Sequence, residues 1–339
     1  MKDKIKIVID ASGGDNAPGE IIKGAVEALN ECEKLEYIMA GDEEKINAEL
    51  AKYTYPKERV EILHCSEEIE MGDPPVSAIR KKKDSSIVKG MHVLRDGGAD
   101  AFVSAGSTGA ILVGGQIIVG RIKGVERPPL VPLVPHEHGF SCIVDCGANV
   151  DAKPSNLVQF AVMGTLYMKN IMGVENPKVG IVNIGTEEEK GNQLVKDTFP
   201  LLKACPDINF VGSVEARDIP KGVVDVIVCD AFVGNVIIKT YEGVASTLVH
   251  AIKEGMMSSF TGKIGGALVK KPLKEKLKTF SSDEQGGAPM LGLKALVMKA
   301  HGSSDAYAFK HAVLSCVNFV EKDVTGKIQE ALSHTDIVS

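Results

Sequence analysis

Small and hydroxyl-bearing residues follow an apolar stretch in residues 102–111, FVSAGSTGAI. At a junction between a strand and a helix, glycines let an anion approach the backbone, and free N–H groups with the positive end of the helix dipole attract it. The hydroxyls of Ser104, Ser107 and Thr108 would add donors, and Gly109 would leave space. A tight turn with a Ser or Thr helix cap explains the same stretch equally well. The residues at the other strand ends are therefore needed to distinguish an anion site from a helix cap.

Polar side chains also follow three later apolar segments, VDCGANVDAKPSN, VNIGTEEEKGN and VCDAFVGNVIIK. They carry the carboxylate, amide and amine groups that bind and orient ligands: Asp145, Asn149, Asn183, Lys190, Asp230, Asn235 and Lys239. In an open α/β sheet, ligands bind beyond the carboxyl ends of the strands. We therefore expect these groups to form one site with the first segment. Asp10, Asp15 and Asn16 near the N-terminus either share that cleft or make turns.

The elements that position these groups are short β-branched runs alternating with longer runs of helical periodicity. The expected strands are residues 5–11, 36–41, 60–65, 101–106, 142–147, 178–185, 209–214 and 225–230. The expected helices are residues 20–32, 85–97, 156–170, 191–204 and 234–255. This alternation predicts an α/β fold with three α/β/α layers and a mostly parallel sheet. We expect one domain of two lobes over residues 1–339, with 127–135 crossing between the lobes and 256–290 forming an irregular amphipathic insertion.

Composition limits the classes of function. The 339 residues are 44% hydrophobic and 25% charged, with a net charge of −6 and no tryptophan. Such a chain is expected to be globular and cytoplasmic, without a signal peptide or membrane span. Nucleic-acid binding is not expected, because the aromatics do not interleave with the basic runs. Seven cysteines suit reduced core residues better than disulfides, and the pair Cys142 and Cys146 lacks a second ligand pair, so no metal is expected.

Six motifs in order resemble the bacterial phosphate acyltransferase family: IDASGGDNAP, SAGSTGA, DCGANVDAKP, NIGTEEEKGN, CDAFVGNVIIKTYEG and GGAPMLGLKALVMKAHGSSD. The resemblance runs from Lys6 to about Asp323. It implies conversion of long-chain acyl-[acyl-carrier-protein] and inorganic phosphate to acyl phosphate and free carrier protein. A membrane glycerol-phosphate acyltransferase would then use the product in phosphatidic acid and phospholipid synthesis.

The same resemblance implies a fold similar to those of phosphotransacetylases and isopropylmalate dehydrogenases, no cofactor, and a homodimer with residues 256–290 near its interface. The family more often has Asn where this chain has Ser107. Both side chains are small and polar, so we expect the difference to adjust the details of the loop and not to remove activity.

Attack of phosphate on a thioester needs a bound anion, an in-line geometry and stabilisation of charge on the carbonyl oxygen. It does not need a covalent enzyme nucleophile, and the chain has neither a GxSxG motif nor a motif-supported Cys–His pair. We expect Ser104, Ser107, Thr108 and Gly109 to hold phosphate, with Lys190 and Lys239 neutralising it and Asn149 or Asn235 orienting it. His301, in KAHGSSD, would donate to the thioester carbonyl or to phosphate, although a structural role explains a single histidine equally well.

Residues 256–278 combine six lysines with apolar side chains that include Met257, Phe260, Ile264 and Leu268. This pattern predicts peripheral contact with an anionic membrane, against the alternative of a solvated helix face. Residues 80–83, RKKK, are a weaker candidate for docking the acidic carrier protein.

Three alternatives remain open from the sequence. A phosphotransacetylase-like enzyme acting on short-chain acyl-coenzyme A shares the chemistry and differs in its acyl pocket. A nicotinamide-dependent dehydrogenase is disfavoured because no GxGxxG follows a strand. A non-catalytic membrane scaffold has only residues 256–278 in its favour.

Overall fold

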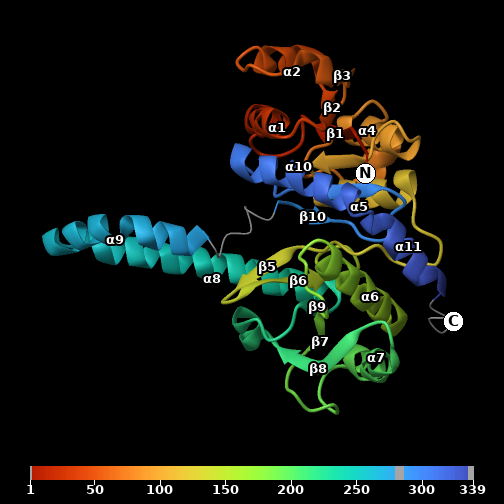
Figure 1. Ribbon diagram of the computed structural model, residues 1–339, viewed down its shortest axis with the longest axis vertical. Helices are drawn as coiled ribbons and strands as arrows, with labels where there is room; N and C mark the ends of the chain where they lie inside the picture. Colours follow the sequence, from red (N-terminus) through yellow and green to blue (C-terminus); the bar gives the residue numbers. More distant parts are fainter. Residues whose placement is uncertain (1, 279–285, 335–339) are drawn as a thin grey trace.

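The protein has two lobes, each built on its own sheet, with a long helical hairpin extending to one side (Figure 1). The computed structural model describes residues 2–278 and 286–334. One sheet has six strands in the order β10-β11-β4-β1-β2-β3, and the other has five in the order β5-β6-β9-β7-β8. Strand β10 is antiparallel to β11 and β5 to β6, and the remaining pairs are parallel. The predicted α/β architecture is confirmed, with its strands divided between two sheets.

The first lobe contains the N-terminal and C-terminal parts of the chain. Its strands are β1 (Ile5–Asp10), β2 (Leu35–Gly41), β3 (Val60–His64), β4 (Ala101–Ser104), β10 (Ala288–Pro289) and β11 (Leu296–Lys299). Its helices are α1 (Gly19–Glu31), α2 (Glu43–Leu50), α3 (Pro75–Lys81), α4 (Ser86–Arg95), α5 (Thr108–Gly114), α10 (Ala306–Glu321) and α11 (Val324–His334). Short helical turns follow at η1 (Lys57–Arg59) and η2 (Gly115–Val119).

The second lobe contains the middle of the chain. Its strands are β5 (Leu133–His136), β6 (Gly139–Val144), β7 (Lys178–Asn183), β8 (Asn209–Glu215) and β9 (Val226–Val228). Its helical elements are α6 (Pro154–Asn170), α7 (Gln193–Ala204), η3 (Ala216–Lys221), and α8 (Ala231–Met257) with α9 (Phe260–Lys278), which form the hairpin. The sequence did not predict β5, β10 or β11: β5 and β10 contain proline, and β11 is only four residues long.

One hydrophobic core joins the two lobes. It includes Ile7 and Val103 from the first sheet, Val228 from the second, and Phe160 of α6 and Phe309 of α10. Helices α4 and α5 cover the opposite face of the first sheet, and η3 with the start of α8 covers the opposite face of the second. Helices therefore lie on both sides of each sheet. The shared core fixes the position of one lobe relative to the other.

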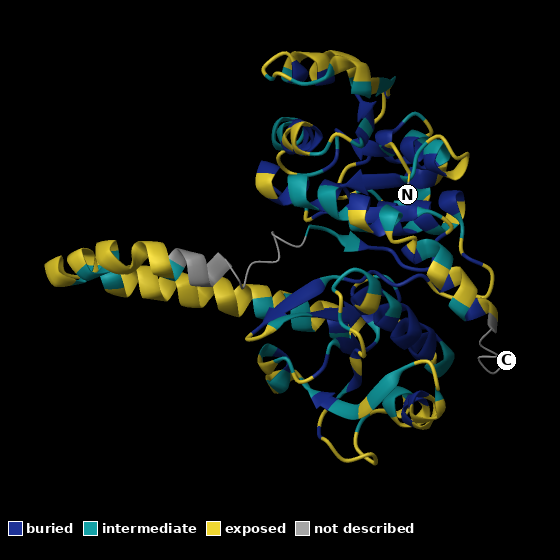
Figure 2. Ribbon diagram, viewed as in Figure 1, coloured by how far each residue is buried: buried dark blue, intermediate teal, exposed yellow. Residues whose placement is uncertain are grey.

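The hairpin differs from the irregular segment that we expected over residues 256–290. Residues Phe260–Lys278 form α9, which packs back along α8, and residues 260–273 of it are mostly exposed (Figure 2). Methionine, leucine, alanine and lysine are strong helix formers, and in this exposed hairpin they override the glycines and Pro272 that suggested irregularity. Residues 279–285 of that prediction lie outside the described residues. No helix in the described part of the chain is long and apolar enough to cross a membrane.

Candidate active site

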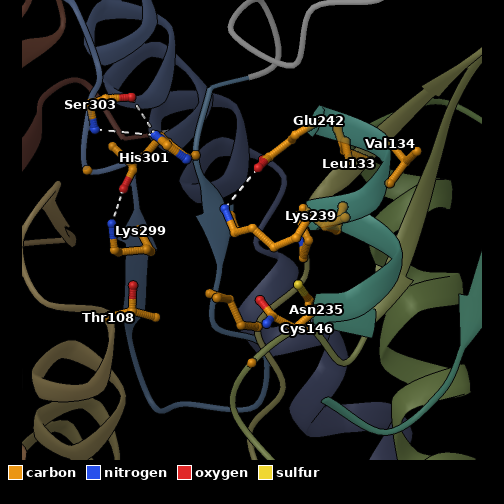
Figure 3. Close-up of a pocket in the computed structure, with 18 of the residues that line it drawn as sticks. Thr108, Leu133, Val134, Cys146, Asn235, Lys239, Glu242, Lys299, His301 and Ser303 are labelled. Atoms are coloured by element: carbon orange, nitrogen blue, oxygen red, sulfur yellow. Dashed lines mark hydrogen bonds and ion pairs between the residues drawn. The ribbon is translucent and has the colours of Figure 1, made fainter. Parts of the chain in front are cut away.

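A cavity of about 460 Å³ lies between the lobes, and both contribute polar side chains to it (Figure 3). Its polar lining residues include Asp15, Thr108, Asn235, Lys239, Glu242, Lys299, His301 and Ser303. An apolar wall includes Leu130, Pro132, Leu133, Val134, Ile238 and Tyr241. Of the predicted site residues, the structure brings Thr108, Asn235, Lys239 and His301 together here. The cavity therefore combines cationic, amide and carboxylate groups with a hydrophobic surface.

Three adjacent strands of the first sheet end beside this cavity. Lys299 of β11 is in register with Ser104 of β4, and Asp10 ends β1 on the other side of Ser104. The Ser104 hydroxyl donates to Oδ2 of Asp10 over 2.5 Å, and both residues are fully buried. Burial raises the pKa of Asp10, and the hydrogen bond from Ser104 opposes that effect. In this structure Ser104 thus supports the strand ends, and its predicted contact with substrate remains a prediction.

Lys299 is a site residue that the sequence analysis missed. Its side chain is buried, lines the cavity, and donates from Nζ to the carbonyl oxygens of Ala105 and Ala300. Burial lowers the pKa of Lys299 to about 8, although the negative charges of Asp10 and Asp15 act in the opposite direction. The signal was present, because a lysine follows directly on the apolar run ALVM, in the same way that Asp10 ends the first strand.

His301 follows two residues after the end of β11 and is held by the next turn. Its Nδ1 accepts from the Ser303 backbone N–H over 3.3 Å and lies 2.8 Å from the Ser303 hydroxyl. A histidine whose Nδ1 accepts from a backbone N–H carries its proton on Nε2 in the neutral ring. His301 can therefore offer an N–H donor to a bound molecule.

The first turns of α8 supply the other side of the cavity. Asp230 caps the helix by accepting from the Val233 N–H over 2.9 Å, so this predicted substrate ligand is used as an N-cap. Asn235 and Lys239 are one turn apart and share a face of the helix. Lys239 forms an exposed ion pair of 2.8 Å with Glu242.

Gly234 sets the position of these first turns. A Cβ at Gly234 would stand 2.0 Å from the carbonyl oxygen of Asp145, a distance that no side chain tolerates. The absence of a side chain therefore lets α8 rest directly on the end of β6. This contact fixes how far Asn235 and Lys239 reach into the cavity.

Asp145 and Asn149 organise the loop beneath the cavity. Asp145 accepts from the Leu130 N–H over 2.8 Å with one oxygen, and from the N–H and side-chain amide of Asn149 over 2.7 and 2.8 Å with the other. The Asn149 amide also donates to the Pro128 carbonyl over 3.0 Å. Burial raises the pKa of Asp145 to about 6 despite these donors. Both predicted ligands thus shape the wall that Leu130 lines.

Two predicted phosphate ligands of the first segment are engaged around α5. The Ser107 hydroxyl lies 3.5 Å from the Ala110 N–H as the N-cap, a role that Asn fills equally well. A Cβ at Gly109 would stand 2.5 Å from the ring of Pro75, so Gly109 allows α3 and α5 to pack closely. Their contact with phosphate remains a prediction.

Two further predicted residues lie outside the cavity, at the end of β7. The Asn183 amide donates to the Lys190 carbonyl and the Ser213 hydroxyl, each over 3.1 Å. Lys190 forms an exposed ion pair of 2.8 Å with Glu187. Their contact with substrate also remains a prediction.

Cys146 lines the cavity but is poorly suited to act as a nucleophile. Burial raises the pKa of its thiol to about 12, so it is protonated at neutral pH. Within residues 2–278 and 286–334, no group of three or more His, Cys, Asp or Glu side chains could hold a metal ion.

The fold defines a two-lobed α/β/α protein with a cavity between the lobes. The solved structures of phosphotransacetylases share this fold. The protein from Streptococcus pyogenes aligns with a TM-score of 0.60 at 18% identity, covering 94% of each chain. EutD from Staphylococcus aureus aligns with a TM-score of 0.58 at 16% identity, again covering 94% of each chain.

The chain belongs to the phosphate acyltransferase family and is an acyltransferase. The family model described as "Fatty acid synthesis protein" matches residues 5–327. The phosphate acyltransferase of Clostridium novyi is 51% identical over 325 residues, which are 96% of this chain and 98% of that protein. The putative phosphate acyltransferase of Clostridium perfringens strain 13 is 49% identical over 329 residues, 97% of each chain. The family predicted from the six motifs is thereby confirmed.

Proposed function

We propose that this protein transfers a long-chain acyl group from acyl carrier protein to inorganic phosphate, forming acyl phosphate and free carrier protein. The observation that carries the proposal is that Lys239 and Lys299 line one cavity from opposite lobes, beside an apolar wall (Figure 3). Two ammonium groups attract a phosphate dianion, and the apolar wall suits a hydrocarbon chain. The names of the two Clostridium relatives, phosphate acyltransferase and putative phosphate acyltransferase, agree with transfer to phosphate.

The proposed reaction is a direct displacement. A phosphate oxygen forms the new C–O bond with the thioester carbon, the C–S bond breaks, and the proton of hydrogen phosphate ends on the thiol. Lys239, Lys299, Asn235 and Thr108 hold phosphate, and the Nε2–H of His301 stabilises the negative charge that develops on the carbonyl oxygen. The protonated state of Cys146 supports a mechanism without an acyl-enzyme.

The helical hairpin supports two further parts of the proposal. Met257, Phe260, Ile264 and Leu268 are exposed on it, and its lysines would attract anionic lipid headgroups. We infer a cytoplasmic protein that associates peripherally with an anionic membrane, where a glycerol-phosphate acyltransferase consumes its product for phospholipid synthesis. The exposed apolar residues along α8, such as Val244 and Leu248, support a homodimer through this helix.

Trapping the product tests the reaction. The purified chain is incubated with palmitoyl-[acyl-carrier-protein], with and without phosphate, and acyl phosphate is captured with hydroxylamine. We expect phosphate-dependent hydroxamate from the carrier substrate and little from acetyl-coenzyme A. Preference for acetyl-coenzyme A would instead assign the short-chain phosphotransacetylase activity. Failure with both substrates, from a folded protein, would overturn the proposal.

A further inference from the structure

We propose that Lys299 donates the proton that the departing sulfur takes up as the thioester bond breaks. This inference rests on the proposed function and assigns a step that it leaves open. The argument starts from the position of Lys299. It is the last residue of β11, its side chain is buried, and it lines the cavity together with Thr108 and His301.

The contacts of Lys299 leave its ammonium group available to substrate. Nζ donates to two main-chain carbonyl oxygens, those of Ala105 and Ala300, and an ammonium group has three donors. Within the described parts of the chain, no carboxylate forms an ion pair with Lys299, whereas Lys239 across the cavity is paired with Glu242. Asp10 is separated from Lys299 by the intervening strand β4 and accepts from Ser104. One donor of Lys299 thus remains for a bound molecule.

The surroundings of Lys299 suit reversible proton transfer. Burial lowers its pKa to about 8, while Asp10 of β1 and Asp15 of the following loop oppose the shift and Lys239 of α8 adds to it. The other titratable groups that line the cavity are Glu242 and Tyr241 of α8, the protonated thiol of Cys146 and the ring of His301, and the Tyr241 hydroxyl donates to the Pro135 carbonyl oxygen. An alkyl thiol has a pKa of about 8.5, so the acid and the leaving group are matched within about one unit. Lys239, exposed on α8, has no comparable burial.

The step balances without any further reactant. As the C–S bond breaks, its electron pair moves to sulfur and the Lys299 ammonium group gives sulfur a proton, which produces the free thiol. The neutral amine then takes the proton that the phosphoryl group still carries on an oxygen outside the new C–O bond. Lys299 returns to its ammonium form, and the net transfer is from hydrogen phosphate to thiol. His301 keeps its separate role at the carbonyl oxygen.

Leaving groups of different acidity distinguish proton donation from phosphate binding. The full-length wild type, Lys299→Met, Lys299→Arg and Lys239→Met are assayed with two decanoyl thioesters. One releases N-acetylcysteamine, an alkyl thiol that needs a proton, and the other releases thionitrobenzoate, an acidic aryl thiol that leaves as the anion. Phosphate is varied so that kcat and the KM for phosphate are separated, and circular dichroism checks folding.

We expect Lys299→Met to lower kcat on the alkyl thioester by about 10²–10⁴-fold and on the aryl thioester by less than about tenfold. Wild-type kcat on the alkyl thioester should fall above pH 8 as Lys299 loses its proton, and this limb should vanish in the variant. Lys299→Arg keeps the charge but cannot give up its proton, so its KM for phosphate should stay near that of the wild type while kcat on the alkyl thioester falls. If Lys299→Met does not fold, Lys299→Arg still tests the inference.

Lys239→Met should raise the KM for phosphate equally with both thioesters. This is the result expected for a lysine that only binds phosphate. The same behaviour from Lys299→Met, with equal losses on both thioesters and an unchanged pH profile, would overturn the inference and leave the proposed function standing. A wild type without phosphate-dependent product from either thioester or from palmitoyl-[acyl-carrier-protein] would overturn both.

Discussion

Lys239 of α8 and Lys299 of β11 line the same cavity from opposite lobes, and the positive charge of Lys239 helps to lower the pKa of Lys299. Like charges repel, and a phosphate bound between the two ammonium groups would offset that repulsion. Lys299 is buried and Lys239 is exposed. The pair therefore combines a fixed cation in one lobe with an accessible one in the other.

Removing Lys239 should weaken phosphate binding selectively. Lys239→Met is expected to raise the KM for phosphate by about 10- to 100-fold, because a hydrogen bond to a charged group contributes about 1.5–3 kcal/mol. Its exposed pair with Glu242 contributes little to stability, so the melting temperature should hardly change. Lys253→Met, on the same helix and outside the cavity, is the matched control, and a similar rise in both variants would contradict the assignment.

Gly234→Ala should destabilise the fold, since the new Cβ would stand 2.0 Å from the Asp145 carbonyl oxygen. We expect a loss of about 3 kcal/mol in the free energy of unfolding, measured with urea, from overpacking at the start of α8. Gly243→Ala on the same helix is the control, because its Cβ would meet no atom within 4 Å. That variant should gain up to about 1 kcal/mol from helix propensity. Equal stability of the two variants would refute the close contact.

The pH dependence of folding should report on Asp145. Burial raises the pKa of its carboxyl from 3.8 to about 6, so between these pH values the native state holds a proton that the unfolded state has lost. Its contribution to stability is present below about pH 4 and is lost as pH rises through 6. We expect the stability difference between the wild type and Asp145→Asn to shrink by about 3 kcal/mol from pH 4 to pH 7. Urea unfolding at each pH measures the free energy of unfolding of both proteins. A difference that does not change with pH would contradict the raised pKa of Asp145.

Cys146→Ala should retain activity within about fivefold, because the thiol is protonated at neutral pH and direct transfer does not use it. Steady-state kinetics with an acyl thioester and phosphate would show this. A loss of more than about 100-fold, together with an acyl-enzyme seen by mass spectrometry of the wild type, would indicate covalent catalysis instead.

Membrane contact should depend on the tip of the hairpin. A double variant, Met257→Asp and Phe260→Asp, is expected to lose flotation with phosphatidylglycerol vesicles, since the new carboxylates oppose both apolar insertion and the anionic surface. Ile184→Asp is the matched control, because Ile184 and Phe260 are each 79% exposed but Ile184 lies on the distant loop after β7. Unchanged flotation of the double variant would exclude the hairpin tip as the contact.

Much of the fold follows from local patterns. The eight predicted strands and five predicted helices are present, because β-branched runs and helical periodicity report directly on backbone preference and on the buried face. The edge strands β5 and β10, which contain proline, and the short β11 were not predictable, since strands of a few residues are stabilised mainly by pairing with neighbours.

The sequence by itself determined the residue types of the site, the strand ends that carry them and the family. It could not tell which polar groups face the cavity. Tertiary structure directs Asn235, Lys239 and His301 into it, turns Asp145 and Asn149 into supports for its wall, and places Lys190 on an exposed loop. It also buries Lys299, and that burial is what lowers the pKa of its amine. Local patterns fix which groups occur at strand ends, whereas packing between the lobes decides their orientation and hydration, and with these their chemistry.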